Sequence, residues 1–207
     1  MLTRTVTTND PQALELALQT LRRGGMVVFP TDTLYGLSCD PTNPAALYAI
    51  YTAKNRPTLK AIPVLIGETT QLQELVAALP PQAERLIQRY WPGPLTLVLP
   101  KNSALPTELT PYPGLALRMP NHPFARALLQ KTGPLAVTSA NISERENPQD
   151  AGEVRAQLEG RVDLILDGGK LRGGMASTII DCMGAEPKLL REGPIAFEDI
   201  LTLWAAE

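Results

Sequence analysis

Proline and glycine interrupt this chain along its whole length. The 207 residues include 20 prolines and 15 glycines, which are spread through the sequence rather than gathered in one block. Because proline interrupts both helices and strand ladders, no regular element can extend far. The sequence therefore predicts many short helices and strands in one domain spanning residues 1–207, without an interdomain linker, a disordered block or an internal repeat.

Two kinds of segment are predicted between these interruptions. Helix caps and apolar periodicity predict helices from Pro11 to the Gly24-Gly25 pair, from Pro44 to the turn containing Lys54, and near 70–78, 81–90, 122–131 and 195–204. Strands are predicted at 26–29, 61–66, 94–100, 114–120 and 134–141, and in "VDLILDGG", "STIIDC" and "KLLRE". Since helices and strands alternate only in part, we expect an α/β (α+β) fold with a mixed, twisted sheet.

Composition and charge exclude several classes of protein. The formal net charge is -2, so no global basic field attracts nucleic acid, and any site for a polyanion must be a local cluster. The polar N-terminus does not resemble a signal peptide, and no apolar run approaches membrane-spanning length. Cys39 and Cys182 are too few for a disulfide framework and belong to no metal-binding pattern. We therefore expect a reduced, cytoplasmic protein without a membrane partner.

One cation lies on the apolar side of a predicted helix. Lys54 shares a helical face with Leu47 and Ile50 through i, i+3 and i+7 spacing. Pro57 ends the helix just beyond and pushes Arg56 toward an extended conformation, so both cationic side chains are predicted to project into the same space. On these residues alone, a snorkelling lysine and solvated cations at a helix C-terminus are the simpler interpretation.

Three later strands also end in polar or cationic side chains. Arg118 is predicted on the opposite strand face from its apolar neighbours, Ser139 and Asn141 end another apolar run, and Arg191 follows two leucines. Taken singly, these residues are typical of an exposed arginine, a helix cap or an Asx turn. Together they repeat one pattern, an apolar strand that ends in a cation or a hydroxyl. That pattern is typical of ligand clefts at strand ends in α/β sheets.

A further polar group directly follows an apolar strand at 27–30. Alternation predicts that Thr31 and Thr33 point to one side and Asp32 to the other, with Leu34 and Tyr35 adding an apolar wall. Two hydroxyls and a carboxylate at a strand end could bind a small polar molecule. A polar turn that caps the strand is the alternative interpretation.

Six segments together resemble one known family. "FPTDTLYGL", "KNRP", "LALRMP", "SANIS", "STIID" and "LLREGP" occur in the order and rough spacing of the YrdC family, and the resemblance runs from about residue 12 to 200. It implies a twisted mixed sheet with helices around a concave basic cavity. It also implies that L-threonine, bicarbonate and ATP are converted to threonylcarbamoyl-AMP and pyrophosphate. Some members carry a further C-terminal domain, for which this chain is expected to be too short.

The resemblance assigns roles residue by residue. It implies that Lys54 and Arg56 of the Lys-x-Arg motif face the ATP phosphates and take part in catalysis. Further nucleotide contacts are implied for Ser139 and Asn141 of the Ser-x-Asn motif and for Arg191. The residues implied to lie near bound threonine are Thr31 or Thr33, Tyr35, Arg118 and Ser177. Downstream proteins are implied to transfer the threonylcarbamoyl group to tRNA.

The chain departs from the family pattern at one position. Some members have a histidine at the end of the strand after Lys-x-Arg, whereas this chain has Leu65, Ile66 and Gly67 there. The difference concerns one threonine contact and leaves the nucleotide site unchanged. His122, the single histidine of the sequence, is predicted to be a structural or capping residue without a catalytic role.

The implied chemistry needs positioned cations more than a strong base, because negative charge gathers on groups that are already anionic. The glycine-rich segment 167–174 lacks the spacing of a P-loop and is predicted to be a flexible loop. Mg²⁺ is expected to accompany ATP, held largely by phosphate oxygens and water. No protein ligand for it is assigned; Asp32 and Asp181 are candidates, and either could instead cap a turn.

Two other functions stay open on the sequence. A concave basic surface would suit an RNA-binding module, and YrdC proteins have been described as binding RNA, so weak RNA binding is one alternative. The negative net charge and the lack of clustered aromatic residues for base stacking count against it. A YciO-type paralogue would share the fold with weak or different activity, although the "KNRP" and "SAN" segments favour the synthase.

Overall fold

The computed structural model describes residues 2–171 and 174–206. Its strands are β1 (Arg4–Thr7), β2 (Val27–Pro30), β3 (Tyr35–Cys39), β4 (Val64–Leu65), β5 (Leu95–Pro100), β6 (Gly114–Arg118), β7 (Leu135–Ser139), β8 (Leu164–Asp167), β9 (Thr178–Asp181) and β10 (Lys188–Arg191). Its helices are α1 (Ala13–Arg22), α2 (Pro44–Lys54), the 3₁₀ turn η1 (Thr69–Gln71), α3 (Leu72–Leu75), α4 (Pro81–Tyr90), α5 (Pro123–Thr132), α6 (Ala151–Leu158) and α7 (Phe197–Ala205). None of the helices within the described ranges is both long and apolar enough to cross a membrane.

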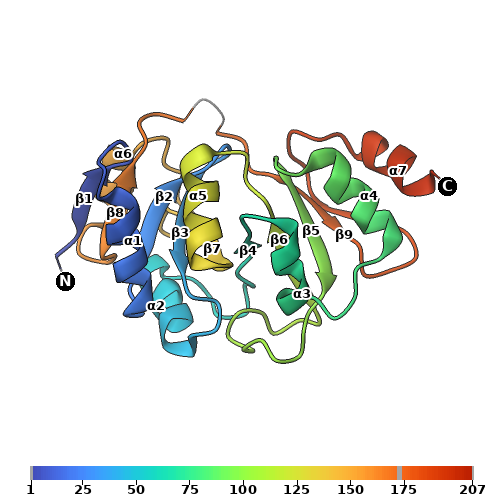
Figure 1. The fold of residues 1–207 in the computed structure, drawn as a ribbon, viewed down its shortest axis with the longest axis horizontal. Coiled ribbons are helices and arrows are strands. Elements are labelled where there is room, and N and C mark those ends of the chain that lie inside the picture. The colour runs from blue at the N-terminus through green and yellow to red at the C-terminus, as the bar shows by residue number, and fades with distance from the viewer. Residues whose placement is uncertain (1, 172–173, 207) are drawn as a thin grey trace.

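The ten strands of the described ranges belong to one mixed, twisted sheet. Their order is β1-β8-β2-β3-β7-β4-β6-β5-β9-β10. The pairs β1–β8, β2–β8, β4–β6 and β5–β9 are parallel, and the other neighbours are antiparallel. Figure 1 shows β1, the first strand, and α7, the last helix, at opposite ends of this sheet. The predicted mixed α/β fold is therefore confirmed.

The sheet separates two hydrophobic cores. Side-chain alternation along β2 sends Val27 and Phe29 into the core shared with α1 and α5, whereas Val28 joins the core shared with α2, α4 and α6. Figure 1 shows α1 and α5 in front of β2, β3 and β7. At the far end of the sheet α4 packs beside α7, and Arg85 of α4 donates hydrogen bonds to the last carbonyls of α7.

Side chains just before the first two helices explain where each helix begins. The Asn43 side chain accepts a hydrogen bond from the Ala46 backbone N at 3.2 Å, and α2 begins at Pro44 as predicted. The first helix begins later than predicted, at Ala13. The Asp10 carboxylate accepts a hydrogen bond from the Gln12 backbone N at 2.7 Å, which stabilises a turn instead of a first helical turn.

Three elements were not predicted, and one was predicted too long. In β1 only Val6 is buried, so its polar residues carry no strand pattern. The fully buried strand β3 was missed because Gly36 and Ser38 interrupt its apolar run. Helix α6 was also missed, and the strand predicted at 61–66 is limited to β4.

Candidate functional site

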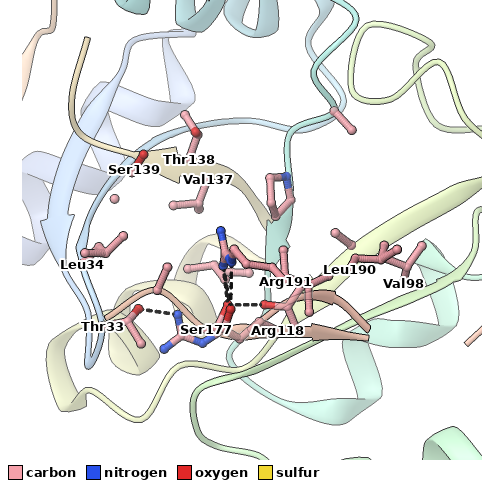
Figure 2. A pocket seen from close by; sticks show the side chains of 18 of the residues that line it. Thr33, Leu34, Val98, Arg118, Val137, Thr138, Ser139, Ser177, Leu190 and Arg191 are labelled. Atoms are coloured by element: carbon pink, nitrogen blue, oxygen red, sulfur yellow. Dashed lines mark hydrogen bonds between the residues drawn. The ribbon is translucent and has the colours of Figure 1, made fainter. Parts of the chain in front are cut away.

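A cavity of about 670 Å³ lies where several strands of the sheet end. Its walls come from the turn after β2, from the loop between α2 and β4, and from strands β5, β6, β7, β9 and β10. Eight of the ten residues proposed from the sequence line it, namely Thr31, Thr33, Tyr35, Arg56, Arg118, Ser139, Ser177 and Arg191. Figure 2 shows Thr33, Arg118, Ser177 and Arg191 gathered on one side of this cavity.

The polar group after β2 forms the turn of a β-hairpin. β2 and β3 pair in antiparallel fashion, with Pro30 opposite Tyr35. The Thr31 hydroxyl donates to the Leu34 carbonyl at 2.6 Å, accepts from the Leu34 backbone N at 3.1 Å and lies 3.2 Å from the Thr33 hydroxyl. Both interpretations of this segment therefore describe part of it, because a polar turn also lines the cavity.

Arg118 binds this turn through two of its nitrogens. Nη1 donates to the Thr33 hydroxyl at 2.6 Å, Nη2 donates to an Asp32 carboxylate oxygen, and Nε donates to the Gly93 carbonyl at 2.8 Å. As alternation predicted, Thr31 and Thr33 line the cavity and Asp32 does not, although Arg118 reaches both Thr33 and Asp32. Desolvation lowers the pKa of Arg118, and the opposing charge of Asp32 limits that shift.

A second cluster joins residues that the resemblance assigned to different ligands. Arg191 donates to the Ser177 carbonyl from Nε at 3.0 Å and from Nη2 at 2.8 Å, and to the Ser177 hydroxyl at 3.0 Å. The Ser177 hydroxyl also lies 2.7 Å from the Thr96 hydroxyl. Burial lowers the pKa of Arg191, and the nearby charge of Arg118 lowers it further. An anion between the two guanidinium groups would relieve this repulsion.

The cavity as a whole is cationic, as the resemblance implied. Arg56, Arg118 and Arg191 line it, together with one carboxylate, Asp181. Arg56 is half-buried; its Nη2 donates to the Ala61 carbonyl at 2.8 Å, and its Nε donates to the Lys60 carbonyl at 3.2 Å. Burial lowers the pKa of Arg56. Two backbone carbonyls thus hold its guanidinium at the cavity wall.

Two of the ten proposed residues lie outside the cavity lining. The expectation that the Lys54 ammonium projects into the cavity is corrected by its contacts: it is 1% exposed, and Nζ donates to the carbonyls of Ser139 and Asn141. Asn141 is 6% exposed and turns its side chain toward backbone groups of its own loop. Desolvation, with a smaller contribution from the charge of Arg56, lowers the pKa of Lys54 to about 7. The nucleotide roles implied for both residues stay predictions.

Tyr35 is a lining residue whose hydroxyl anchors the glycine-rich loop. Its hydroxyl donates to the Gly169 carbonyl at 2.6 Å and accepts from the Gly168 backbone N at 3.1 Å. Burial raises the pKa of Tyr35 to about 12. The same loop is tied to the hairpin turn by a hydrogen bond from the Gly174 N to the Thr33 carbonyl at 3.2 Å. Residues 172–173, in the loop predicted to be flexible, lie outside the described residues.

Removing the Tyr35 hydroxyl is expected to lower the melting temperature and to leave the threonine requirement nearly unchanged. Tyr35→Phe leaves the Gly168 N and the Gly169 carbonyl without this partner, at a cost of about 1–3 kcal/mol, which corresponds to about 2–12 °C in melting temperature. Tyr48→Phe, on the exposed side of α2, serves as the matched control. A thermal melt checks this expectation. An unchanged melting temperature with a large rise in threonine requirement would instead place the hydroxyl on the ligand.

The candidate metal ligands and the histidine have structural partners. Asp32 pairs with Arg118, and the Asp181 carboxylate accepts a hydrogen bond from the Met183 N at 2.8 Å. His122 caps α5 by accepting a hydrogen bond from the Ala125 N at 3.4 Å, which confirms its predicted capping role. Leu65, in the segment where some family members have a histidine, lines the cavity with an apolar side chain.

Sequence reasoning missed several lining residues. Thr96 is 3% exposed and faces the cavity from β5, where a single threonine in an apolar strand resembles ordinary β-propensity. Asn147 lines the cavity from a loop without a recognisable pattern. Tyr112 also lines the cavity, and the residue as a whole is 55% exposed. Each becomes visible only when the chain is folded.

Comparisons with known proteins show which proteins this chain is similar to. Residues 19–193 match the Sua5/YciO/YrdC family model, which is described as "Telomere recombination". The chain is 42% identical over 198 residues to the threonylcarbamoyl-AMP synthase of Bacillus subtilis, a match that covers 94% of this chain and 57% of that protein. It is 35% identical over 179 residues to the threonylcarbamoyl-AMP synthase of Marinobacter nauticus, covering 84% of this chain and 94% of that protein.

Solved structures share the fold. The structure of Pyrococcus abyssi Sua5 complexed with L-threonine superposes with a TM-score of 0.92 at 36% identity, covering 98% of this chain and 61% of that one. Escherichia coli YciO superposes with a TM-score of 0.85 at 27% identity, covering 97% and 98%. This chain thus spans less than two thirds of the Bacillus and Pyrococcus proteins and nearly all of YciO.

Proposed function

The chain belongs to the Sua5/YciO/YrdC family, and we propose that it forms threonylcarbamoyl-AMP and pyrophosphate from L-threonine, bicarbonate and ATP. The relatives named for this product, and the L-threonine in the Pyrococcus structure, support the proposal. The Bacillus and Pyrococcus proteins are longer than this chain, so the proposal rests on the residues that this chain itself contains.

The observation that carries the proposal is the shared cavity. Arg118, Thr33 and Ser177, which the family resemblance connects with threonine, line the same space as Arg56 and Ser139, which it connects with ATP. A volume of about 670 Å³ lies within the range of sites that enclose small ligands. One cavity can therefore hold an amino acid beside a nucleotide, and holding the reactants together is a large part of such catalysis.

The proposed reaction forms two bonds. The threonine amine attacks the carbon of bicarbonate, water leaves, and a carbamate results. A carbamate oxygen then attacks the α-phosphorus of ATP while the bond to the β-phosphate oxygen breaks and pyrophosphate departs. Negative charge rises on phosphate oxygens, so we assign its stabilisation to Arg56 and Arg191. Arg118 is assigned to the threonine carboxylate, because a guanidinium matches a carboxylate in geometry as well as charge.

Mg²⁺ is proposed to enter with ATP rather than in a cage of protein ligands. Among the described residues, no three His, Cys, Asp or Glu side chains are grouped to hold a metal ion. Asp181 is the carboxylate that lines the cavity beside the three arginines. This donor set fits an ion held mainly by phosphate oxygens and water, where it would neutralise phosphate charge.

Pyrophosphate release is expected to require threonine and bicarbonate together. Because a pocket distinguishes one methyl group by about 1–3 kcal/mol, serine should support release about 10- to 200-fold less efficiently than threonine. The measurement is pyrophosphate release with ATP and Mg²⁺ and one amino acid at a time. A buffer freed of bicarbonate and carbon dioxide serves as the control.

Three results would count against the proposed function. Equal release with serine and threonine would show that the pocket does not select the substrate methyl group. No release with any amino acid would favour a YciO-type protein of different activity. RNA binding that depends steeply on salt, without any ATP turnover, would favour the RNA-binding alternative.

The product is proposed to pass to other proteins that transfer the threonylcarbamoyl group to tRNA. Cys39 and Cys182 are both free and buried, which suits a reducing compartment. We therefore propose that the protein works in the cytoplasm, where ATP and tRNA are present.

A further inference from the structure

Lys54 is bound to the loop after β7 through its side chain and its backbone. Nζ donates to the Ser139 carbonyl, to the Asn141 carbonyl at 2.5 Å and to the Asn141 side-chain oxygen at 3.3 Å. The Lys54 carbonyl accepts a hydrogen bond from the Ser143 N at 2.9 Å. An ammonium group has three N–H donors, and these three oxygens match them in number. Bound in this way, Lys54 keeps no N–H for a phosphate.

Asn141 completes the same network from the other side. Its side-chain oxygen accepts hydrogen bonds from Lys54 Nζ and from the Ser139 hydroxyl, the latter at 2.6 Å. Its side-chain nitrogen donates to the carbonyls of Ile142 at 3.0 Å and Arg145 at 2.7 Å. These partners are Lys54 at the end of α2, Ser139 at the end of β7 and residues of the loop that follows, so the amide links all three segments.

The two motifs place these residues in alternation with cavity residues. Arg56 lies two positions after Lys54, and Ser139 lies two positions before Asn141; both Arg56 and Ser139 line the cavity. Between Lys54 and Arg56, Asn55 adopts a left-handed conformation with φ 51°, which ends α2 and turns the chain. Lys54 and Asn141 thus face the protein interior, whereas Arg56 and Ser139 face the cavity.

We propose that Lys54 and Asn141 form a clasp that positions Arg56 and Ser139 at the cavity wall, and that neither clasp residue contacts the substrates. The clasp joins the end of α2, two residues before Arg56, to the end of β7, which carries Ser139. The part of this inference that concerns ATP rests on the proposed function. The clasp itself is a property of the ligand-free protein.

Lys54→Met tests the clasp, since methionine keeps most of the apolar stem and removes the three donors. We expect the melting temperature to fall by about 5–10 °C, because buried acceptors lose a charged partner. Amide exchange in residues 139–145 of the ligand-free protein should accelerate at least about tenfold. The ATP concentration for half-maximal turnover should rise more than the threonine concentration.

Lys131→Met is the matched control, because Lys131 also lies in the last turn of a helix but is exposed. The melting temperature of the Lys131→Met variant and its amide exchange in residues 139–145 should match those of the wild type. Asn141→Ala should reproduce the exchange pattern of Lys54→Met, and the double variant should add little to either single change because both act through one network.

Melting and exchange need no substrate, so the clasp and the proposed function can fail separately. If Lys54→Met loses ATP use while its melting temperature and loop exchange match the wild type, Lys54 contacts the phosphates directly and the clasp is overturned. If Lys54→Met does not fold, Asn141→Ala decides: faster exchange in 139–145 supports the clasp, and unchanged exchange overturns it.

Discussion

Arg118→Ala is expected to raise the threonine concentration for half-maximal pyrophosphate release about 100- to 1000-fold, while the ATP requirement changes less than about tenfold. Arg118 is 5% exposed and holds both the Thr33 hydroxyl and the Asp32 carboxylate. Truncation removes the proposed partner of the threonine carboxylate. It also leaves the Asp32 charge free to repel that carboxylate, so both effects weaken threonine binding.

The same substitution is expected to lower stability by about 3 kcal/mol, because it breaks a buried ion pair by removing one partner. Kinetics should therefore be measured well below the melting temperature of the variant. Arg155→Ala provides the control, since it removes an arginine from an exposed pair with Glu159 and should cost at most about 1 kcal/mol. An equal rise in the threonine and ATP concentrations for half-maximal release would indicate a general folding defect. It would contradict the threonine role of Arg118.

Arg56→Met is expected to reduce ATP-dependent turnover about 100-fold or more, with a melting temperature within about 3 °C of the wild type. Among the residues that the structure describes, two of its five N–H groups donate to backbone carbonyls, which leaves the others for an anion in the cavity. Removing one preorganised cation from a phosphate site typically costs two to three orders of magnitude in rate. Pyrophosphate release at varied ATP, beside a thermal melt, measures both quantities.

Arg145→Met is the matched control for Arg56→Met. Arg145 lies in the neighbouring loop and is exposed, and its side chain is not part of the cavity lining. The same change in net charge there should alter turnover less than about threefold. If both variants lose activity equally, the effect comes from the general field of the protein. Turnover close to wild type in Arg56→Met would remove Arg56 from the phosphate site.

The sequence by itself determined the class of fold, and its resemblance to a family pointed to eight residues that line the cavity. Short apolar runs between prolines and glycines predicted a mixed sheet, and local capping by Asn43 placed the start of α2 correctly. Six motifs indicated the family, and the family model confirms it over residues 19–193. These features act over a few residues of chain, so they can be read without knowing how the chain folds.

The sequence did not predict the role of residues whose type is common in several structural environments. β3 contains Gly36 and Ser38 and lies inside the sheet, where tertiary burial outweighs its weak strand propensity. Thr96 resembles any strand threonine until β9 is placed beside β5 and brings Ser177 within 2.7 Å of it. In both strands, the environment of these residues is set by the strands that pair beside them.

Only the tertiary structure decided which polar groups face the cavity and which hold it together. Helical spacing correctly placed Lys54 on the buried side of α2, but its partner Asn141 is 87 positions away, and Arg118 and Asp32 are 86 positions apart. A hydrogen bond forms only when donor and acceptor approach within about 3 Å. Over such separations that approach depends on strand order, register and the geometry of turns. Spacing within α2 therefore placed Lys54 on the buried face, whereas the packing of α2 against the loop after β7 set its contacts.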